Sequence, residues 1–250
     1  MSKKSDQNKH SALAYDQPPQ WAREAIWYQI FVERFRNGNP ENDPTPETCH
    51  NALIDSLPAD WALTPWGHNW YKQEEWAKPT GLDFYRTIQM RRYGGDLTGV
   101  EEKIPYFKEL GINAIYFNPI NDAPSLHKYD ARHYHHIDVT FGDDIKGDLA
   151  LMAEENHEDP STWHWTTADR KFLKLVNKLH QEGIRVILDF SWNHTGNNFW
   201  AFKDVEKNLE NSHYKDWYHT RFIKDSLSGN VSMEYEGWIG IKNLPELRKI

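Results

Sequence analysis

The chain has 250 residues, with 29 basic and 37 acidic side chains and a formal net charge of −8 at pH 7. This length allows one large or two ordinary domains, and the excess of acid argues against a nucleic-acid-binding surface. Cys49 is the only cysteine, which excludes an internal disulfide. No run approaches the roughly 18 apolar residues of a membrane span, and the first twenty residues hold no signal-peptide stretch. A cytoplasmic location is therefore the default expectation. Secretion or export to a periplasm stays open, because a removed leader would leave the same appearance.

In chain order, the polar residues 1–20 predict a disordered N-terminal arm. Alternating apolar residues predict a strand over 25–35, and a long excursion over 37–93 follows. That excursion carries the aromatic run Trp61, Trp66, Trp70, Tyr71 and Trp76, which lacks core periodicity and predicts either exposed rings or a loop staple. A helix is predicted over 100–110, and a strand over 112–119 that ends at Pro119. A second excursion runs from 120 to about 160.

The segment 169–196 carries the strongest pattern in the chain. Apolar residues at helical spacing predict a helix over 169–182 that ends at Gly183. Arg185 to Leu188 is aliphatic and predicts a buried strand, and polar residues follow where that strand ends. In a barrel of alternating strands and helices, catalytic chemistry sits at the carboxyl ends of the strands. The sequence therefore predicts a functional site after this strand.

The polar cluster Asp189-Phe-Ser-Trp-Asn193-His194 resembles a signature of the alpha-amylase family of glycoside hydrolases, found at the end of barrel strand 3. Three further segments match in the expected order. Phe31–Asp43 resembles the end of strand 1 in neopullulanases, maltogenic amylases and cyclodextrin glucanotransferases, and Arg92–Gly99 resembles the start of the first barrel helix. Ser125–Asp130, followed by Tyr134 and Phe141-Gly-Asp143, resembles the loop after strand 2. The resemblance covers residues 25–247. It implies an α/β fold in which residues 21–194 form the N-terminal part (strands 1 to 3) of a (β/α)8 TIM barrel, and residues 195–250 begin a loop insertion similar to domain B.

The resemblance also implies an activity, which is retaining hydrolysis or transfer of α-1,4-glucosidic bonds in starch-like α-glucans. Tyr129 would stack on the sugar ring at the cleaved bond, and His194 would hydrogen-bond to its hydroxyls. Both residue types suit these roles, because the ring becomes oxocarbenium-like and a neutral imidazole donates and accepts. Asp130 would be a substrate-side acid, with Asp189 and Asn193 as supports of the site. The 12 Trp and 12 Tyr of the chain fit the flat apolar faces of sugars.

A calcium site is the second chemical prediction. Asn37, Asn39, Asn42 and Asp43 place side-chain oxygens around Gly38 at a spacing that a tight loop can wrap about a hard cation. The resemblance adds the backbone carbonyl of Gly94 and the carboxylate of Asp96. Taken without the resemblance, such a loop is more often a plain turn. Two charged ligands predict weaker binding than a carboxylate-rich loop would give.

Catalytic residues are not predicted within the 250 residues. In the family, the nucleophile and the general acid follow strands 4 and 5, and no segment here matches their motifs. The chain alone is therefore expected to be inactive, and a catalytically inactive glucan-binding fragment is the alternative function. A metalloenzyme is a third hypothesis, on His133, His135, His136 and Asp138, or on His157 and His164. Ordinary surface or core histidines explain these residues more simply, because no acid stands at a catalytic spacing.

Overall fold

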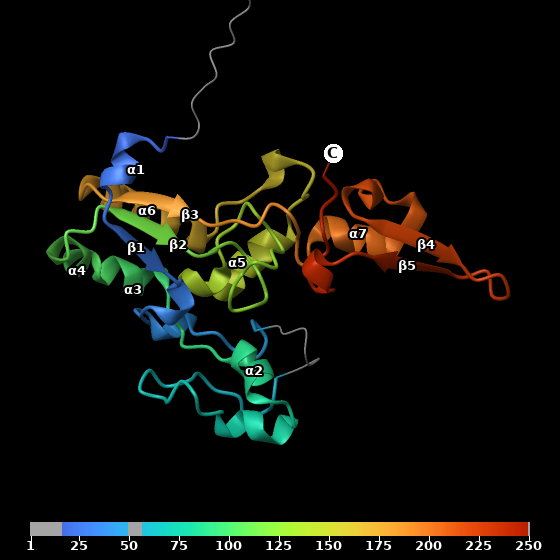
Figure 1. Cartoon of the computed structure of the whole chain (residues 1–250), viewed down its shortest axis with the longest axis horizontal. Helices are drawn as coiled ribbons and strands as arrows, with labels where there is room; N and C mark the ends of the chain where they lie inside the picture. The colour runs from blue at the N-terminus through green and yellow to red at the C-terminus, as the bar shows by residue number, and fades with distance from the viewer. Residues whose placement is uncertain (1–16, 50–56, 250) are drawn as a thin grey trace, which may run out of the picture.

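The computed structural model describes residues 17–49 and 57–249 (Figure 1). Three parallel strands form one sheet in the order β1 (Trp27–Ile30), β2 (Ala114–Phe117) and β3 (Arg185–Leu188). In the register of this sheet, Tyr28 lies opposite Ile115, which lies opposite Val186. Residues 1–16 of the predicted disordered arm are outside the described residues, and a short helix, α1 (Gln20–Glu24), precedes the sheet. All three predicted strands are present, although β1 and β2 are shorter than predicted.

Helices α3 (Leu97–Glu102), α4 (Ile104–Glu109) and α6 (Thr167–Gln181) connect the strands and share one apolar core with them. Helix α6 begins with a capping box, in which Thr166 Oγ1 accepts from Asp169 N at 3.0 Å and the Asp169 carboxylate accepts from Thr166 N at 3.0 Å. It leads into β3 through Gly183, whose φ of 75° suits glycine. Within residues 17–49 and 57–249, no helix is long and apolar enough to cross a membrane.

Two predicted elements need correction. The helix predicted over 100–110 is two helices that meet at Lys103, because Pro105 has no N–H to continue the hydrogen-bond ladder and its ring clashes with the preceding turn. The strand predicted over 25–35 ends at Ile30, and the chain continues as a 3-10 turn. The buried carboxylate of Glu33 in that turn accepts the backbone N–H groups of Tyr93 and Gly94, which ties the end of β1 to the segment that precedes α3.

The two long excursions between strands and helices, residues 37–93 and 120–160, contain helices that the hydrophobic periodicity of the sequence did not predict. Helix α5 (Ile145–Ala153) lies in the second excursion, where no helix was predicted, and Asp144 caps it by accepting from Gly147 N at 2.9 Å. Helix α2 (Phe84–Thr87) lies in the first excursion. Short 3-10 helices span Val32–Arg34, Pro40–Asn42, Glu75–Thr80, Ile88–Met90, Val139–Phe141, Pro160–Thr162, Leu209–Asn211, Lys215–Trp217 and Trp238–Gly240.

The aromatic run of the first excursion divides into two kinds of residue. Trp61 and Trp76 are buried together, with ring centroids 6.3 Å apart, and form a small cluster with Met90. Trp70 and Tyr71 are 62% and 91% exposed, and Trp66 is also exposed. Both alternatives left open by the sequence therefore occur, since two rings staple the loop and three face solvent.

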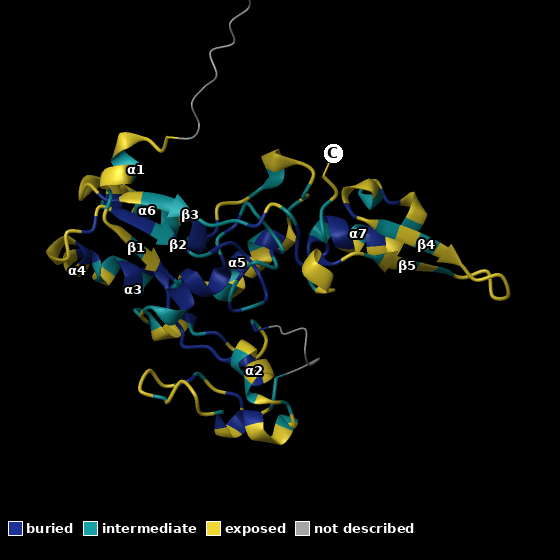
Figure 2. Ribbon diagram, in the orientation of Figure 1, coloured by how far each residue is buried: buried dark blue, intermediate teal, exposed yellow. Residues whose placement is uncertain are grey.

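After β3, the chain forms helix α7 (Trp200–Asn208) and an antiparallel hairpin of β4 (Thr220–Lys224) and β5 (Val231–Tyr235), at the right of Figure 1. These elements enclose their own cluster around Phe202 and Tyr218, separate from the core of the sheet. Figure 2 shows the hairpin largely exposed and the central strand β2 largely buried. The assignment of this region to a domain B-like insertion stays a prediction.

Candidate functional site

Tyr129 and Asp189 meet at the carboxyl edge of the sheet. Tyr129 belongs to the loop after β2, and Asp189 directly follows β3. Because these parallel strands are neighbours, both segments emerge at the same edge, and Tyr129 Oη donates to Asp189 Oδ2 at 2.6 Å. Burial, followed by this hydrogen bond, raises the pKa of Tyr129 to about 12, so its phenol stays protonated at neutral pH. The structure thus joins two of the residues predicted for the sugar site.

One buried and one partly buried ion pair brace the loop that carries Tyr129. Arg132 makes a bidentate pair with Asp122, at 3.0 Å through Nε and 2.7 Å through Nη2. Lys128 Nζ lies 2.6 Å from Asp138 Oδ2, and Lys128 itself has a φ of 57°, a conformation that non-glycine residues rarely adopt. Removing one partner of a buried pair costs about 3–5 kcal/mol. These ion pairs brace the loop around Tyr129, and sequence patterns did not reveal them.

Backbone acceptors link this loop to the segment after β3. Tyr134 Oη lies within hydrogen-bonding distance of two carbonyl oxygens, 2.9 Å from Ser191 O and 2.8 Å from His194 O. Ser191 Oγ donates to the carbonyl of Tyr129 at 3.0 Å. Asp130 is half-buried and accepts from Ser125 Oγ. Every residue offers a carbonyl, so the sequence carried no signal for the bracing role of Tyr134.

His194 lies at the same edge but is 2% exposed. Its imidazole stacks on Trp238 with ring centroids 5.0 Å apart, and neither ring nitrogen has a hydrogen-bond partner among the described residues. Burial lowers the pKa of this imidazole, which favours its neutral form. Asn193 is half-buried, and its carbonyl accepts from Leu247 N at 2.9 Å. Contact of His194 with a sugar would require the segments that cover it to move.

The six residues predicted for calcium gather between the end of β1 and the start of α3. Asn37 Nδ2 lies 2.5 Å from Asp43 Oδ1, and both side chains press against Gly94, where an added Cβ would lie 2.5 Å from Asp43 Oδ1. Asp96 caps α3 by accepting from Gly99 N at 2.7 Å, and it also accepts from Asn39 N at 2.8 Å. Asn39 Oδ1 is engaged locally by the backbone N–H of Glu41 at 3.2 Å.

Two amide oxygens in this loop fit a cation. Asn37 Oδ1 and Asn42 Oδ1 are buried, and neither has a hydrogen-bond partner among residues 17–49 and 57–249. Burial raises the pKa of both Asp43 and Asp96, and the charge of Asp96 raises the pKa of Asp43 further. A partly buried set of carboxylate and amide oxygens with unsatisfied acceptors is an environment that suits Ca²⁺. The residues present therefore fit the ion that the resemblance implies.

A histidine cluster lies beside the β2 loop, where the segment 154–166 folds against it. His133, His135 and His157 each offer a ring nitrogen, and these nitrogens lie within 4.8 Å of one another. Glu155 hydrogen-bonds to His135 Nε2 at 3.1 Å and to His136 Nε2 at 2.9 Å. Burial, followed by the neighbouring histidines, lowers the pKa of His133 to about 3.

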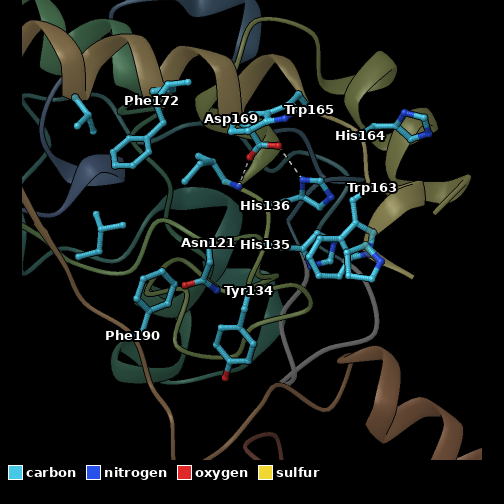
Figure 3. A pocket seen from close by; sticks show the side chains of 15 residues that line it. Asn121, Tyr134, His135, His136, Trp163, His164, Trp165, Asp169, Phe172 and Phe190 are labelled. Atoms are coloured by element: carbon cyan, nitrogen blue, oxygen red, sulfur yellow. Dashed lines mark hydrogen bonds and ion pairs between the residues drawn. The ribbon is translucent and has the colours of Figure 1, made fainter. Parts of the chain in front are cut away.

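The pKa of His136 is raised, whereas the pKa values of His133, His135 and His157 are lowered. Burial lowers the pKa of His136, but hydrogen bonds to Asp169 at 2.8 Å and to Glu155 outweigh burial and leave the pKa raised. Two other residues of the metalloenzyme hypothesis lie apart. Asp138 pairs with Lys128, and the side chain of His164 is exposed and points away in Figure 3. None of these histidines lies on a strand.

Comparison with known proteins identifies the family. A profile described as "Alpha amylase, catalytic domain" matches residues 29–160 and 164–238. The chain belongs to this family. Neopullulanase 2 of Thermoactinomyces vulgaris is 38% identical over 232 residues, which are 92% of this chain and 30% of that protein. A cyclomaltodextrinase from Bacillus sp is 38% identical over 207 residues, which are 83% of this chain and 27% of that protein.

Solved structures of the family share the fold of the chain. The ligand-free cyclic alpha-maltosyl-(1-->6)-maltose hydrolase from Arthrobacter globiformis superposes with a TM-score of 0.61 at 26% identity, over 92% of this chain and 39% of that one. A cyclomaltodextrinase superposes with a TM-score of 0.57 at 33% identity, over 92% and 30%. The sheet β1-β2-β3 and its helices are thus the N-terminal part of a (β/α)8 barrel, as predicted. The chain spans about 30% of the length of its first curated relatives.

Proposed function

We propose that the chain supplies the substrate-holding wall of an enzyme that hydrolyses or transfers α-1,4-glucosidic bonds in starch-like glucans. The observation that carries this proposal is the hydrogen bond between Tyr129 and Asp189 at the carboxyl edge of adjacent barrel strands, where barrel enzymes place their chemistry. The relatives include proteins named neopullulanase, cyclomaltodextrinase and maltogenic alpha-amylase, whose names describe action on glucans.

Each site residue has a proposed task. Asp189 fixes the rotation of the Tyr129 side chain through Oη, which leaves the ring free to face a sugar whose charge develops during cleavage. The ring nitrogens of His194 have no partner within the described part of the chain, and sugar hydroxyls would satisfy them once the residues that cover His194 move. Asp130 would meet the substrate, while Asn193 supports the segment through its backbone.

Bond cleavage with retention needs two carboxyl groups about 5–5.5 Å apart, one as nucleophile and one as general acid. We assign neither role to this chain. The buried Glu33 carboxylate pairs with Arg34 at 2.9 Å and accepts hydrogen bonds from the backbone N–H groups of Tyr93 and Gly94. The catalytic test therefore uses the full-length gene product.

That protein is expected to release reducing sugar from maltooligosaccharides, β-cyclodextrin or pullulan, with the α-anomer formed first because a double displacement retains configuration. Proton NMR of the initial products reads the anomer before mutarotation, and glucose polymers with β-1,4 links serve as the control substrate. Initial formation of the β-anomer, or cleavage of the control polymer alone, would contradict the proposal.

We also propose that Asn37, Asn39, Asn42, Asp43, Asp96 and the carbonyl of Gly94 hold Ca²⁺. Calcium should raise the thermal midpoint of the protein, because an ion that binds only the folded state adds about 2.7 kcal/mol at 100 times its Kd. Asp43→Asn should abolish this rise, since it removes one of two charged ligands with little change of shape. The matched control is Asp159→Asn, an exposed cap of a short turn. Identical melting curves in chelator and in excess calcium would show that the loop is only a turn.

A further inference from the structure

The histidine cluster beside the β2 loop is assembled from three parts of the chain. His133 and His135 come from the loop after β2, His157 comes from the segment between α5 and α6, and Trp200 of α7 covers His157. Figure 3 shows His135 against Trp163 at the rim of an apolar hollow of about 520 Å³. The sugar site proposed above uses none of these imidazoles.

Two of the imidazoles have unmet polar atoms. His133 Nδ1 and His157 Nδ1 are buried, and the described residues provide no hydrogen-bond partner for either. A buried polar atom without a partner costs about 1–3 kcal/mol, so such atoms call for a missing ligand or water. His135 and His136, in contrast, already share the carboxylate of Glu155. The ring nitrogens that still need a partner are therefore those of His133 and His157.

We propose that His133, His135 and His157 bind one transition-metal ion, with Zn²⁺ as the physiological candidate. Their nitrogens lie within 4.8 Å of one another. In the tetrahedral geometry of zinc, Zn–N bonds of about 2.0–2.1 Å place ligand nitrogens about 3.4 Å apart, so binding must draw the three rings together by up to about 1.4 Å. Three imidazoles suit zinc, copper or nickel and disfavour Ca²⁺ and Mg²⁺, which prefer oxygen.

The surroundings of the cluster orient the ligands. Glu155 hydrogen-bonds to His135 through Nε2 at 3.1 Å, and a carboxylate behind a ligating histidine is a common way to fix such a ring. The Glu155 side chain is fully buried and is itself held by the backbone N–H of His164 at 2.7 Å. Trp163 stacks on His135 at 3.9 Å between centroids, and Trp200 stacks on His157 at 5.5 Å. Each of these rings therefore covers one face of a proposed ligand.

The ion would act as a structural cross-link near the sugar site. Tyr134 stands between two of the ligands and contacts the carbonyls of Ser191 and His194. The same short segment therefore contacts the histidine cluster through His133 and His135 and the His194 loop through Tyr134. Binding would hold the segment 154–166 against the barrel and steady that loop.

The first experiment measures metal content in the untagged full-length protein. After treatment with a chelator and dialysis against ZnCl₂, plasma mass spectrometry should find about one Zn²⁺ per chain. His135→Phe and His157→Phe keep rings for the stacks on Trp163 and Trp200 but remove the ligating nitrogens. Each should weaken Zn²⁺ binding on the order of 100-fold or more. His164→Gln, an exposed histidine of the same segment, is the matched control and should retain the ion.

A second readout separates this site from the calcium loop. Zn²⁺ should raise the thermal midpoint of the wild-type protein and of His164→Gln but not of His157→Phe. Calcium should raise the midpoint in all three, because its site is made of oxygen ligands elsewhere. Equal zinc content in the wild type and in the double variant His135→Phe/His157→Phe would overturn the proposal.

If the phenylalanine variants do not fold, X-ray absorption at the zinc edge of the wild-type protein decides. The expected spectrum shows imidazole scattering from about three nitrogen ligands at about 2.0–2.1 Å. Zinc bound by oxygen alone, or no zinc retained after dialysis, would show that the histidines form only a hydrogen-bonded cluster.

Discussion

Tyr129→Ala in the full-length protein is expected to lower kcat/KM for α-1,4-glucans by about 10-fold or more, because a loss of about 1.4 kcal/mol of transition-state binding is a factor of ten. The variant removes both the ring proposed to face the sugar and the hydroxyl that donates to Asp189 at 2.6 Å. Steady-state kinetics on a maltooligosaccharide measure the effect. His194→Ala should give a loss of similar size, since it removes the imidazole proposed to hydrogen-bond to the sugar hydroxyls.

Tyr129→Phe separates the two contributions of the tyrosine. It keeps the ring and removes only the hydrogen bond to Asp189, so a smaller loss than in Tyr129→Ala is expected if stacking dominates. Tyr85→Ala is a matched control, because Tyr85 is exposed on α2, outside the sugar site. Wild-type kinetics in both Tyr129→Ala and His194→Ala would remove these residues from the site.

The polypeptide of residues 1–250, expressed alone, is expected to show no hydrolysis of α-1,4-glucans and to self-associate. Activity should be absent because no residue in it matches the nucleophile or the acid, and binding residues do not replace them. Association should follow because β1 and β3 are both edges of the described sheet, although barrel strands are normally paired on both sides. Beside β3, Phe172, Val176 and Leu188 line an open apolar hollow.

Two measurements check this prediction. Reducing-sugar release by the purified polypeptide reports the activity, and light scattering reports its mass. The full-length protein at the same concentration is the control for both. A monodisperse monomer that unfolds cooperatively and releases maltose would show that the catalytic carboxylates lie within residues 1–250.

Local patterns predicted the elements whose signals are local. The strand at Arg185–Leu188 has the predicted bounds, and the helix predicted over 169–182 is α6 (Thr167–Gln181), because a regular apolar face, a cap and Gly183 all agree. The single helix predicted over 100–110 was wrong, because the apolar spacing used for that prediction took no account of the break that Pro105 imposes. Helix α5 was missed because it lies in a long excursion with little sequence periodicity, although Asp144 offered a capping signal.

The site was predictable in its residue types but not in its contacts. The motifs placed Tyr129 and Asp189 on neighbouring strand ends, whereas the hydrogen bond between them joins residues that are 60 positions apart. Glu155 escaped notice because nothing local links it to His135 and His136. The burial of His194 under Trp238 depends on how the segment after α7 returns to the barrel, which sequence patterns do not specify.

A crystal structure of the full-length protein with a bound maltooligosaccharide tests the central claim most directly. The account predicts that a glucose ring lies face to face with Tyr129, that Asp189 still accepts from Tyr129 Oη, and that the segment with Trp238 has moved so that His194 reaches a sugar hydroxyl. A sugar bound away from the carboxyl ends of β2 and β3, with Tyr129 and His194 untouched, would contradict it.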